Sequence, residues 1–168
     1  MNKEAINEFD EVFSKYAPIG KKGHEGISIL FFVISLIGLL APLSDGSVLD
    51  HEDILFIVFF TVIFTFLSMA FYMTPALTVI QDSRRKAIYP MLRYTPCDRK
   101  MFIKSRLNKM IKRTATMAVI ALAVRALLAA TGIFGNAWSM MDVLIVFVGF
   151  GIIPFVTGCI YILVYTRK

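Results

Sequence analysis

The chain has 168 residues, of which 57% are hydrophobic and only 18% charged, with a formal net charge of +6. Soluble globular domains are about 45–50% apolar, and the mean hydropathy here is +0.70. The composition excludes a disordered chain, a collagen-like chain and a disulfide-rich secreted scaffold. It predicts a single membrane domain over residues 1–168.

Four apolar stretches are close to the length of about 17–25 residues that a helix needs to cross a bilayer. None contains Asp or Glu, and none alternates in polarity as the strands of a membrane barrel do. The sequence therefore predicts an all-α, polytopic membrane protein. The four transmembrane helices are expected at residues 27–43, 54–80, 114–134 and 143–165.

The basic residues are distributed unevenly between the predicted connections. Eleven of the 18 Lys and Arg residues lie between residues 84 and 113, four precede the first span and two end the chain. The connection between the first and second spans has only acidic charges, at Asp45, Asp50, Glu52 and Asp53. The positive-inside rule then predicts a multi-pass cell-membrane protein with both termini and the long loop 81–113 in the cytoplasm. Anionic lipid headgroups, and not nucleic acid, are the expected neighbours of these cations.

Residues 1–26 form the cytoplasmic segment ahead of the first span. Ile6, Phe9, Phe13 and Tyr16 recur at helical spacing, which predicts an amphipathic helix in the interface plane. Its polar face is rich in acidic residues, so lipid headgroups and a protein partner both remain possible neighbours.

The loop between the second and third spans is long and patterned. Residues 82–88 are expected to continue the second helix into the cytoplasm until Pro90 interrupts it. A new helix is then predicted, with Thr95 as its cap, Pro96 at the first position and Asp98 at the third. This helix is expected to run without a break into the third span.

Two interpretations of this loop are open. A solvated basic loop that only sets topology would explain its charge. A folded element that docks on a partner would also explain its length and its apolar residues, which are Tyr89, Met91, Leu92, Tyr94 and Phe102.

The run from Thr95 to Arg106 resembles a segment of ABC-2-type transporter permeases. Members of that family often carry a Leu-Pro-x-x-Arg-Lys pattern in the first cytoplasmic loop, followed by an apolar pair, a small residue and a Lys. Thr95 stands in place of the usual Leu, and Arg106 in place of the usual Lys. The matching residues are Pro96, Arg99, Lys100, Phe102, Ile103 and Ser105.

The resemblance implies that this loop is a coupling helix that presses against a separate cytoplasmic ATP-binding subunit. The implied contact residues are Tyr94, Pro96, Arg99, Lys100, Phe102, Ile103 and Arg106. Family members usually have six spans per permease half, so this chain resembles a shortened form, acting as a homodimer or with a second permease. The sequence has no Gly-x-x-x-x-Gly-Lys-Ser/Thr phosphate loop of its own.

Single residues inside the spans allow two interpretations each. Arg125 in the third span is costly in hydrocarbon. It either lines a polar translocation path or has a structural role, in which it is bonded to helix carbonyls and hydroxyls or snorkels outward. Pro75 and Pro154 interrupt helix hydrogen bonding, and each serves either helix packing or a hinge.

No enzyme activity, metal site or cofactor is predicted. His24 and His51 are expected on opposite sides of the membrane, and neither has a second His or Cys at metal-ligand spacing. The predicted function is a permease subunit of an ABC-type export system. The alternative is a small membrane scaffold whose basic loop binds a cytoplasmic partner without transport.

Overall fold

The computed structural model describes residues 11, 18–38, 51–81, 84–94, 98–131 and 140–167. The predicted amphipathic helix over residues 1–17, apart from Glu11, lies outside this described part, as do residues 39–50, 82–83, 95–97 and 132–139. Statements below about what is present or absent concern the described residues.

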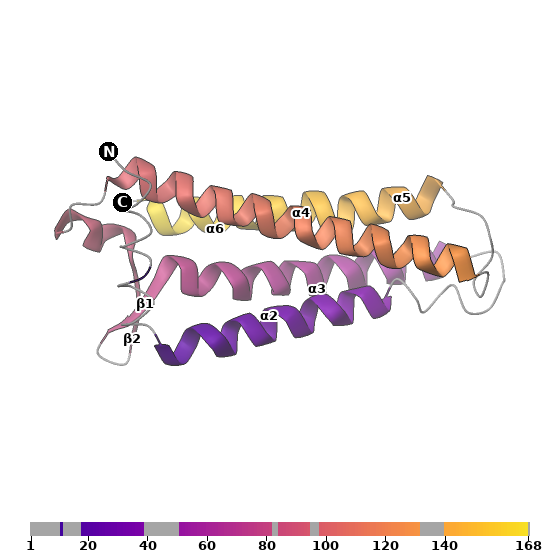
Figure 1. Cartoon of the computed structure of the whole chain (residues 1–168), viewed down its shortest axis with the longest axis horizontal. Helices are drawn as coiled ribbons and strands as arrows, with labels where there is room; N and C mark the ends of the chain where they lie inside the picture. The colour runs from indigo at the N-terminus through magenta and orange to yellow at the C-terminus, as the bar shows by residue number, and fades with distance from the viewer. Residues whose placement is uncertain are drawn as a thin grey trace.

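Four long helical segments lie side by side (Figure 1). They are α2 (Pro18–Gly38), α3 (His51–Leu77), α4 (Arg99–Thr131) and a composite fourth segment. The composite segment consists of α5 (Met140–Val146), the π-helix η3 (Phe147–Ile152) and α6 (Ile153–Thr166). The molecule is thus mostly helical, as predicted, and α2 begins at Pro18, ahead of the expected first span.

Two of the described helices are long and apolar enough to cross a membrane. They run over Leu55–Leu77 and Val143–Thr166, and Gly23–Ile37 is a shorter apolar helix. Length and composition thus support two membrane-capable helices, and the four-span arrangement stays a prediction.

The prediction that helix continues through residues 82–88 is wrong. Helix α3 ends at Leu77, and the chain forms an antiparallel hairpin of β1 (Thr78–Gln81) and β2 (Arg84–Ala87). Thr78, Val79 and Ile80 are consecutive β-branched residues, which favour extended backbone. The backbone N–H of Ile88 then donates to the carbonyl oxygen of Leu77 at 3.0 Å and closes the hairpin against the end of α3.

The segment after the hairpin is the 3₁₀-helix η2 (Tyr89–Tyr94), with Pro90 at its second position. The loop is therefore only partly helical before α4 begins. The predicted start of α4 is also wrong, because the helix begins at Arg99. Asp98 caps it: its carboxylate accepts a hydrogen bond from the Lys100 backbone N–H at 3.1 Å, and its carbonyl accepts one from Phe102 at 3.0 Å.

Helix α4 continues from Arg99 to Thr131 without a break, as predicted. Its 33 residues span about 50 Å at 1.5 Å per residue. One rigid rod therefore connects the basic region to the far end of the bundle.

The irregularity expected at Pro154 takes the form of a π-helical turn. The Ile153 N–H donates to the carbonyl oxygen of Val148, five residues earlier. Pro154 has no N–H to donate, and its ring crowds the carbonyl four residues before it. The wider turn of η3 accommodates both effects, whereas Pro75 lies within α3 without ending it.

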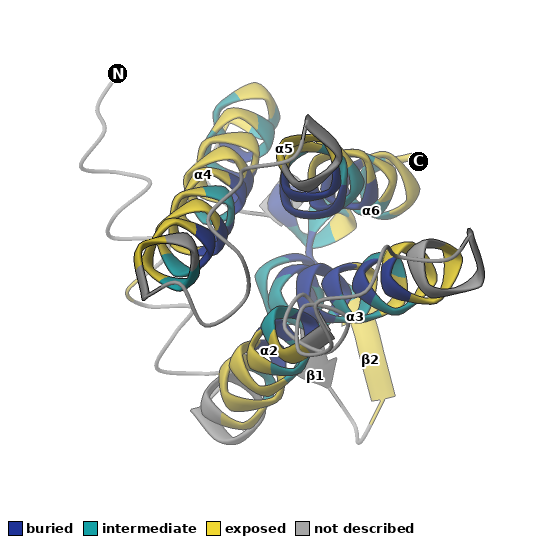
Figure 2. Ribbon diagram, turned by 90° about the vertical axis from the view of Figure 1, so that its right-hand side faces the viewer, coloured by how far each residue is buried: buried dark blue, intermediate teal, exposed yellow. Residues whose placement is uncertain are grey.

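The helices pack in the order α2, α3, α6, α4 around the bundle. Helix α2 packs against α3, α3 against α6, and α4 against α6 and η3. Viewed from the end, buried residues face the centre of the bundle and exposed residues face outward (Figure 2).

Two apolar clusters fill the interior. The Phe150 cluster contains Phe32, Ile57, Met117, Ala121, Ile145, Val146 and Phe150. The Phe102 cluster lies at the end of the bundle that carries the hairpin and contains Met69, Met73, Leu77, Ile88, Leu92, Phe102, Met110 and Ile162.

Gly158 allows α6 to approach α4 closely within the Phe102 cluster. A Cβ atom at this position would come within 2.3 Å of the Met110 Sδ atom and 2.9 Å of the Met69 Cε atom, whereas one at Gly151 meets nothing within 4 Å. Met110 and Met69 are fully buried, so neither side chain can move without disturbing the cluster.

We therefore expect Gly158→Ala to destabilise the bundle and Gly151→Ala not to do so. Alanine has the better helix propensity at both positions, whereas only Gly158→Ala creates a steric overlap. We expect Gly158→Ala to be less stable than Gly151→Ala by about 1–3 kcal/mol, which is typical of overpacking. Thermal unfolding of the purified variants in one detergent measures this difference, and equal stabilities would contradict the packing described.

Candidate functional site

The hairpin and η2 are anchored to the bundle through the Phe102 cluster. Phe102 at the start of α4 is 2% exposed, and Ile88 and Leu92 are buried beside it. The same cluster includes Leu77 of α3 and Ile162 of α6. Burying each such side chain contributes about 1.5–3 kcal/mol. The described part of the loop is therefore packed on three helices, as the interpretation of a folded element predicts.

The implied ATPase-contact residues are divided between the interior and the surface. Phe102 and Arg106 are buried, and the Arg106 guanidinium lies over the Phe102 ring, 4.6 Å from its centre. Ile103 is half-buried against the Phe102 cluster. These three residues join α4 to the core.

Arg99 and Lys100 lie toward the surface of the same helix. The Arg99 guanidinium lies 5.2 Å from the centre of the Tyr89 ring and holds the end of α4 against η2. Lys100 is exposed. Tyr94 ends η2, although its side chain lies outside the described part of the structure, as does Pro96.

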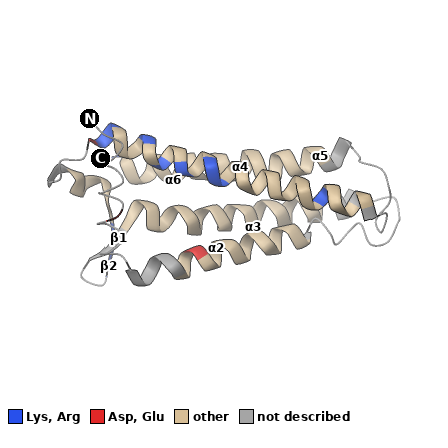
Figure 3. Ribbon diagram, in the orientation of Figure 1, with Lys and Arg blue, Asp and Glu red and all other residues tan. Residues whose placement is uncertain are grey.

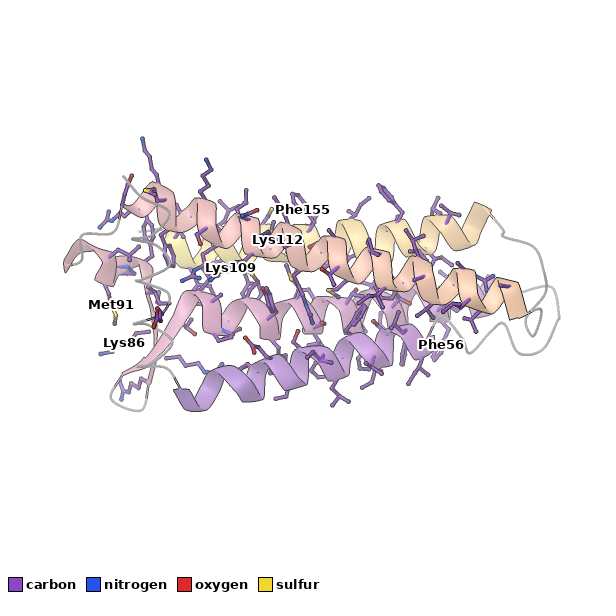
Figure 4. All side chains as sticks on the ribbon, viewed as in Figure 1. Phe56, Lys86, Met91, Lys109, Lys112 and Phe155 are labelled. Atoms are coloured by element: carbon purple, nitrogen blue, oxygen red, sulfur yellow. The ribbon has the colours of Figure 1, made fainter. Side chains whose placement is uncertain are left out.

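A basic surface surrounds this junction. It is formed by the exposed side chains of β2 and of the first half of α4, and the helical part is visible in Figure 3, with Lys86, Lys109 and Lys112 labelled in Figure 4. Its members are Arg84, Arg85, Lys86, Lys100, Lys104, Lys109 and Lys112. The surface is suited to an acidic partner or to anionic headgroups.

A buried polar contact joins α2 to α3 just inside this surface. The Ser28 hydroxyl donates to the Ser68 carbonyl oxygen at 2.8 Å, and the Ser68 hydroxyl donates to the Ser28 carbonyl oxygen at 2.7 Å. Both residues are fully buried. Such reciprocal hydrogen bonds between small residues allow close helix packing in apolar surroundings.

Arg113 of α4 reaches this contact from the opposite side. One of its guanidinium nitrogens, Nη2, donates to the Ser28 hydroxyl at 3.3 Å. The guanidinium lies 5.3 Å from the centre of the Tyr72 ring and 6.0 Å from that of Phe32. Burial lowers the pKa of Arg113, while Tyr72 and Glu25 act in the opposite direction; arginine nevertheless stays charged at neutral pH.

Sequence reasoning did not single out Ser28, Ser68 or Arg113. Arg113 was one of many cations in a basic loop, and only its position facing two other helices distinguishes it. A serine within each of two apolar runs was the available signal, because polar residues in such runs tend to face other helices.

Arg125 is buried on the inward face of α4, with 4% of its surface exposed. Met117 and Ala121 precede it at helical spacing on the same face. The structure therefore places Arg125 inside the bundle and not snorkelling outward, which leaves a translocation path and internal stabilisation as the two interpretations. Of the two predicted hinge residues, Pro75 is half-buried and Pro154 is buried.

His24 ties α2 to the hairpin. An Arg85 guanidinium nitrogen lies 2.8 Å from the His24 Nε2 atom, and the imidazole stacks near Phe71 with ring centres 5.5 Å apart. Because arginine can only donate, Nε2 accepts and the ring is neutral. Burial lowers the pKa of His24 below its ordinary value, and the positive charge of Arg85 lowers it further.

Comparison with known proteins adds no evidence on function, so the function has to be inferred from the arrangement described above. No family model matches the chain, and no curated protein and no solved structure matches it either. Within the described residues, no group of three His, Cys, Asp or Glu side chains could hold a metal ion. The likeness of residues 95–106 to ABC-2-type permeases therefore stays a prediction.

We expect the pKa of His24 to rise when Arg85 is replaced by Gln. The nearby positive charge is removed, so protonation becomes easier, while the effect of burial stays. Arg84→Gln is the matched control, because this substitution removes the same charge from the same strand while the Arg85 contact with His24 stays. The chain has only two histidines, so NMR titration of labelled histidine, assigned with His24→Gln, gives the value directly.

The sign of the pH effect follows from the lowered pKa. The neutral imidazole accepts the Arg85 hydrogen bond above about pH 6.5, the ordinary histidine pKa, and this stabilising contact is lost as the pH falls through the pKa of the folded protein. A His24 pKa that is the same in the wild type and in Arg85→Gln would contradict the contact.

Proposed function

We propose that the chain is a four-pass membrane protein whose basic end lies in the cytoplasm. The supporting observation is the extent of apolar side chains on the outer surface of the bundle. Large apolar side chains are exposed on every long helix, including Leu30, Phe59, Leu127 and Leu163, whereas serine and threonine hydroxyls lie inside. A water-soluble monomer rarely exposes apolar surface this extensive, while lipid chains are a suitable solvent for it.

The charge distribution supports the proposed orientation. The hairpin, the start of α4 and the C-terminal end of α6 lie at one end of the bundle (Figure 1). Basic side chains occupy the half of α4 at this end, and Arg125 alone occupies its other half (Figure 3). The positive-inside rule then places this end in the cytoplasm.

We further propose that the chain is the permease subunit of an ABC-type export system, coupled to a separate ATPase through the segment between α3 and α4. The observation that carries this proposal is the Phe102 cluster. A partner that pushes on the described residues 84–94 and 98–106 pushes on elements packed against α3, α4 and α6. Transmission between distant sites needs such rigid elements, which can take up two arrangements.

The shape of α4 also supports coupling. A single helix runs from the basic surface at Arg99 to Thr131, so displacement of its cytoplasmic end displaces its far end. Because four spans are fewer than permease halves usually have, we propose that the chain works as a homodimer or together with a second permease. The ATP-binding subunit supplies the energy.

The decisive experiment is isolation of the tagged chain from its native cells in mild detergent, followed by mass spectrometry of the proteins recovered with it. We expect an ATP-binding subunit. The double charge reversal Lys100→Glu and Lys104→Glu should reduce its recovery about tenfold or more, which corresponds to 1.4 kcal/mol, because both side chains are exposed within the proposed contact.

The matched control is the double reversal Lys109→Glu and Lys112→Glu, an equal charge change at two exposed lysines on the same helix beyond the proposed contact, which should leave recovery unchanged. A single cysteine introduced at Lys86 in a variant without native cysteines reports insertion, since an impermeant thiol reagent outside the cell should not label it. Repeated recovery of partners without any ATPase would contradict transport and favour the membrane scaffold.

A further inference from the structure

The surface between α2 and α4 holds a cation without an acidic partner. Arg113 turns inward from α4 to Ser28 of α2 and to the faces of Tyr72 and Phe32. Among the residues that the structure describes, no carboxylate lies within ion-pairing distance of it, and its Nε atom is buried without a hydrogen-bond partner. A half-buried guanidinium that has donors to spare is a binding group for an anion.

The charges around Arg113 favour an anion. Tyr72 experiences the positive charges of Arg113 and Arg106 and the negative charge of Glu25. Glu25 is exposed to solvent, so it reduces the local positive potential without neutralising Arg113 by direct contact. Lys109 is one turn from Arg113 on the same flank of α4, which leaves an excess of positive charge at this place.

The position along the bundle is that of lipid headgroups. Tyr72 is five residues before Leu77, where α3 gives way to the hairpin, so its level is about 7 Å inside the cytoplasmic end of α3. The headgroup layer on each side of a bilayer is about 5–7 Å thick. In the proposed insertion, with the hairpin in water and the end of α3 among the headgroups, Arg113 lies near the boundary between headgroups and acyl chains.

The flanks of the same surface are apolar toward the membrane centre. On α2, Ile29 precedes Phe32 by one turn and is 51% exposed; on α4, Ile120 follows Arg113 by two turns and is 39% exposed. The Phe150 cluster closes the interior behind them, since Phe32 packs there with Met117 and Ala121. A half-buried cation with exposed apolar side chains beside it matches a molecule that has an anionic head and hydrocarbon tails.

We propose that Arg113, together with Tyr72, binds the phosphate group of an anionic phospholipid from the cytoplasmic leaflet. The inference rests on the proposed membrane insertion but is independent of transport. The guanidinium donates to phosphate oxygens, the Tyr72 hydroxyl adds a donor beside it, and the acyl chains lie against Ile29 and Ile120. Ser28 is buried and already donates to Ser68, so it serves only to orient the guanidinium, from which it accepts a hydrogen bond. Free phosphate offers the same headgroup chemistry without the chains.

The test measures lipid retention by native mass spectrometry. The full chain is reconstituted with equal amounts of phosphatidylglycerol and phosphatidylcholine and then transferred to mild detergent. We expect the wild type to retain phosphatidylglycerol selectively, and Arg113→Gln to retain about tenfold less, because it loses charge-assisted hydrogen bonds. Arg113→Lys keeps the charge and should retain an intermediate amount, provided that it elutes as the wild type does in size-exclusion chromatography.

Lys112→Gln is the matched control, because it removes one positive charge from the adjacent residue on the outward side of α4. Equal retention by the wild type and Arg113→Gln would overturn the proposal, and so would an equal loss in Lys112→Gln, which would indicate general surface attraction. Displacement of the lipid by millimolar inorganic phosphate would assign the site to a free anion. A chain that inserts normally but retains no lipid refutes only this site, whereas a chain that stays in solution without detergent refutes the proposed membrane function.

Discussion

Apolar packing at the basic end of the bundle is the constraint on which the rest of the molecule depends. Phe102, Ile88 and Leu92 leave water together and bury themselves against α3 and α6. Their burial fixes where α4 begins and holds the hairpin beneath the end of α3. The same packing places the buried Arg106 over the Phe102 ring and the half-buried Arg99 over the Tyr89 ring, while the exposed cations of β2 and α4 lie around them. Cation–π contacts of this kind each add about 0.5–2 kcal/mol.

Along the rest of the bundle, many hydroxyl groups lie inside and large apolar side chains cover the outside. Hydroxyl groups inside mostly donate to the carbonyls of their own helix, as Thr65 does to Thr61 at 2.7 Å and Thr157 to Ile153 at 2.8 Å. Ser28 and Ser68 instead bond between helices. Because apolar side chains cover the outside, the hydrophobic effect cannot hold such helices together in lipid, and close packing at Gly149 and Gly158 with interhelical hydrogen bonds must do so.

The sequence predicted the features that follow from long apolar runs. It did not predict the hairpin or the cap of α4, which depend on a few neighbouring residues. The helical character, the continuity of α4 and an irregularity at Pro154 followed from hydrophobicity and from the missing N–H of proline. The hairpin was missed because the charges after Gln81 suggested a solvated helix, whereas Thr78, Val79 and Ile80 favour a strand. Asp98 was assigned to the first turn of α4, although its carboxylate caps the helix.

The buried partners of α4 could not be predicted from one sequence for a different reason. The heptad-like spacing of Arg106, Arg113 and Met117 shows that they share a face, but not which helix that face meets. The packing order α2, α3, α6, α4 brings Arg113 to Ser28 and Phe102 to Ile162. Such contacts depend on the whole bundle, so Arg113, which the sequence counts only among the topology-setting cations, proves to be half-buried between helices.

The most direct test of this account is hydrogen–deuterium exchange of the chain in lipid bilayers, comparing the wild type with Phe102→Ala. A packed element predicts slow exchange of the backbone amides in η2 and in the first turns of α4 in the wild type. It also predicts that the variant loses this protection in residues 84–94 while the amides of α3 before Met69 stay protected. Fast exchange of residues 84–94 in the wild type, or no change on removing the Phe102 ring, would contradict it.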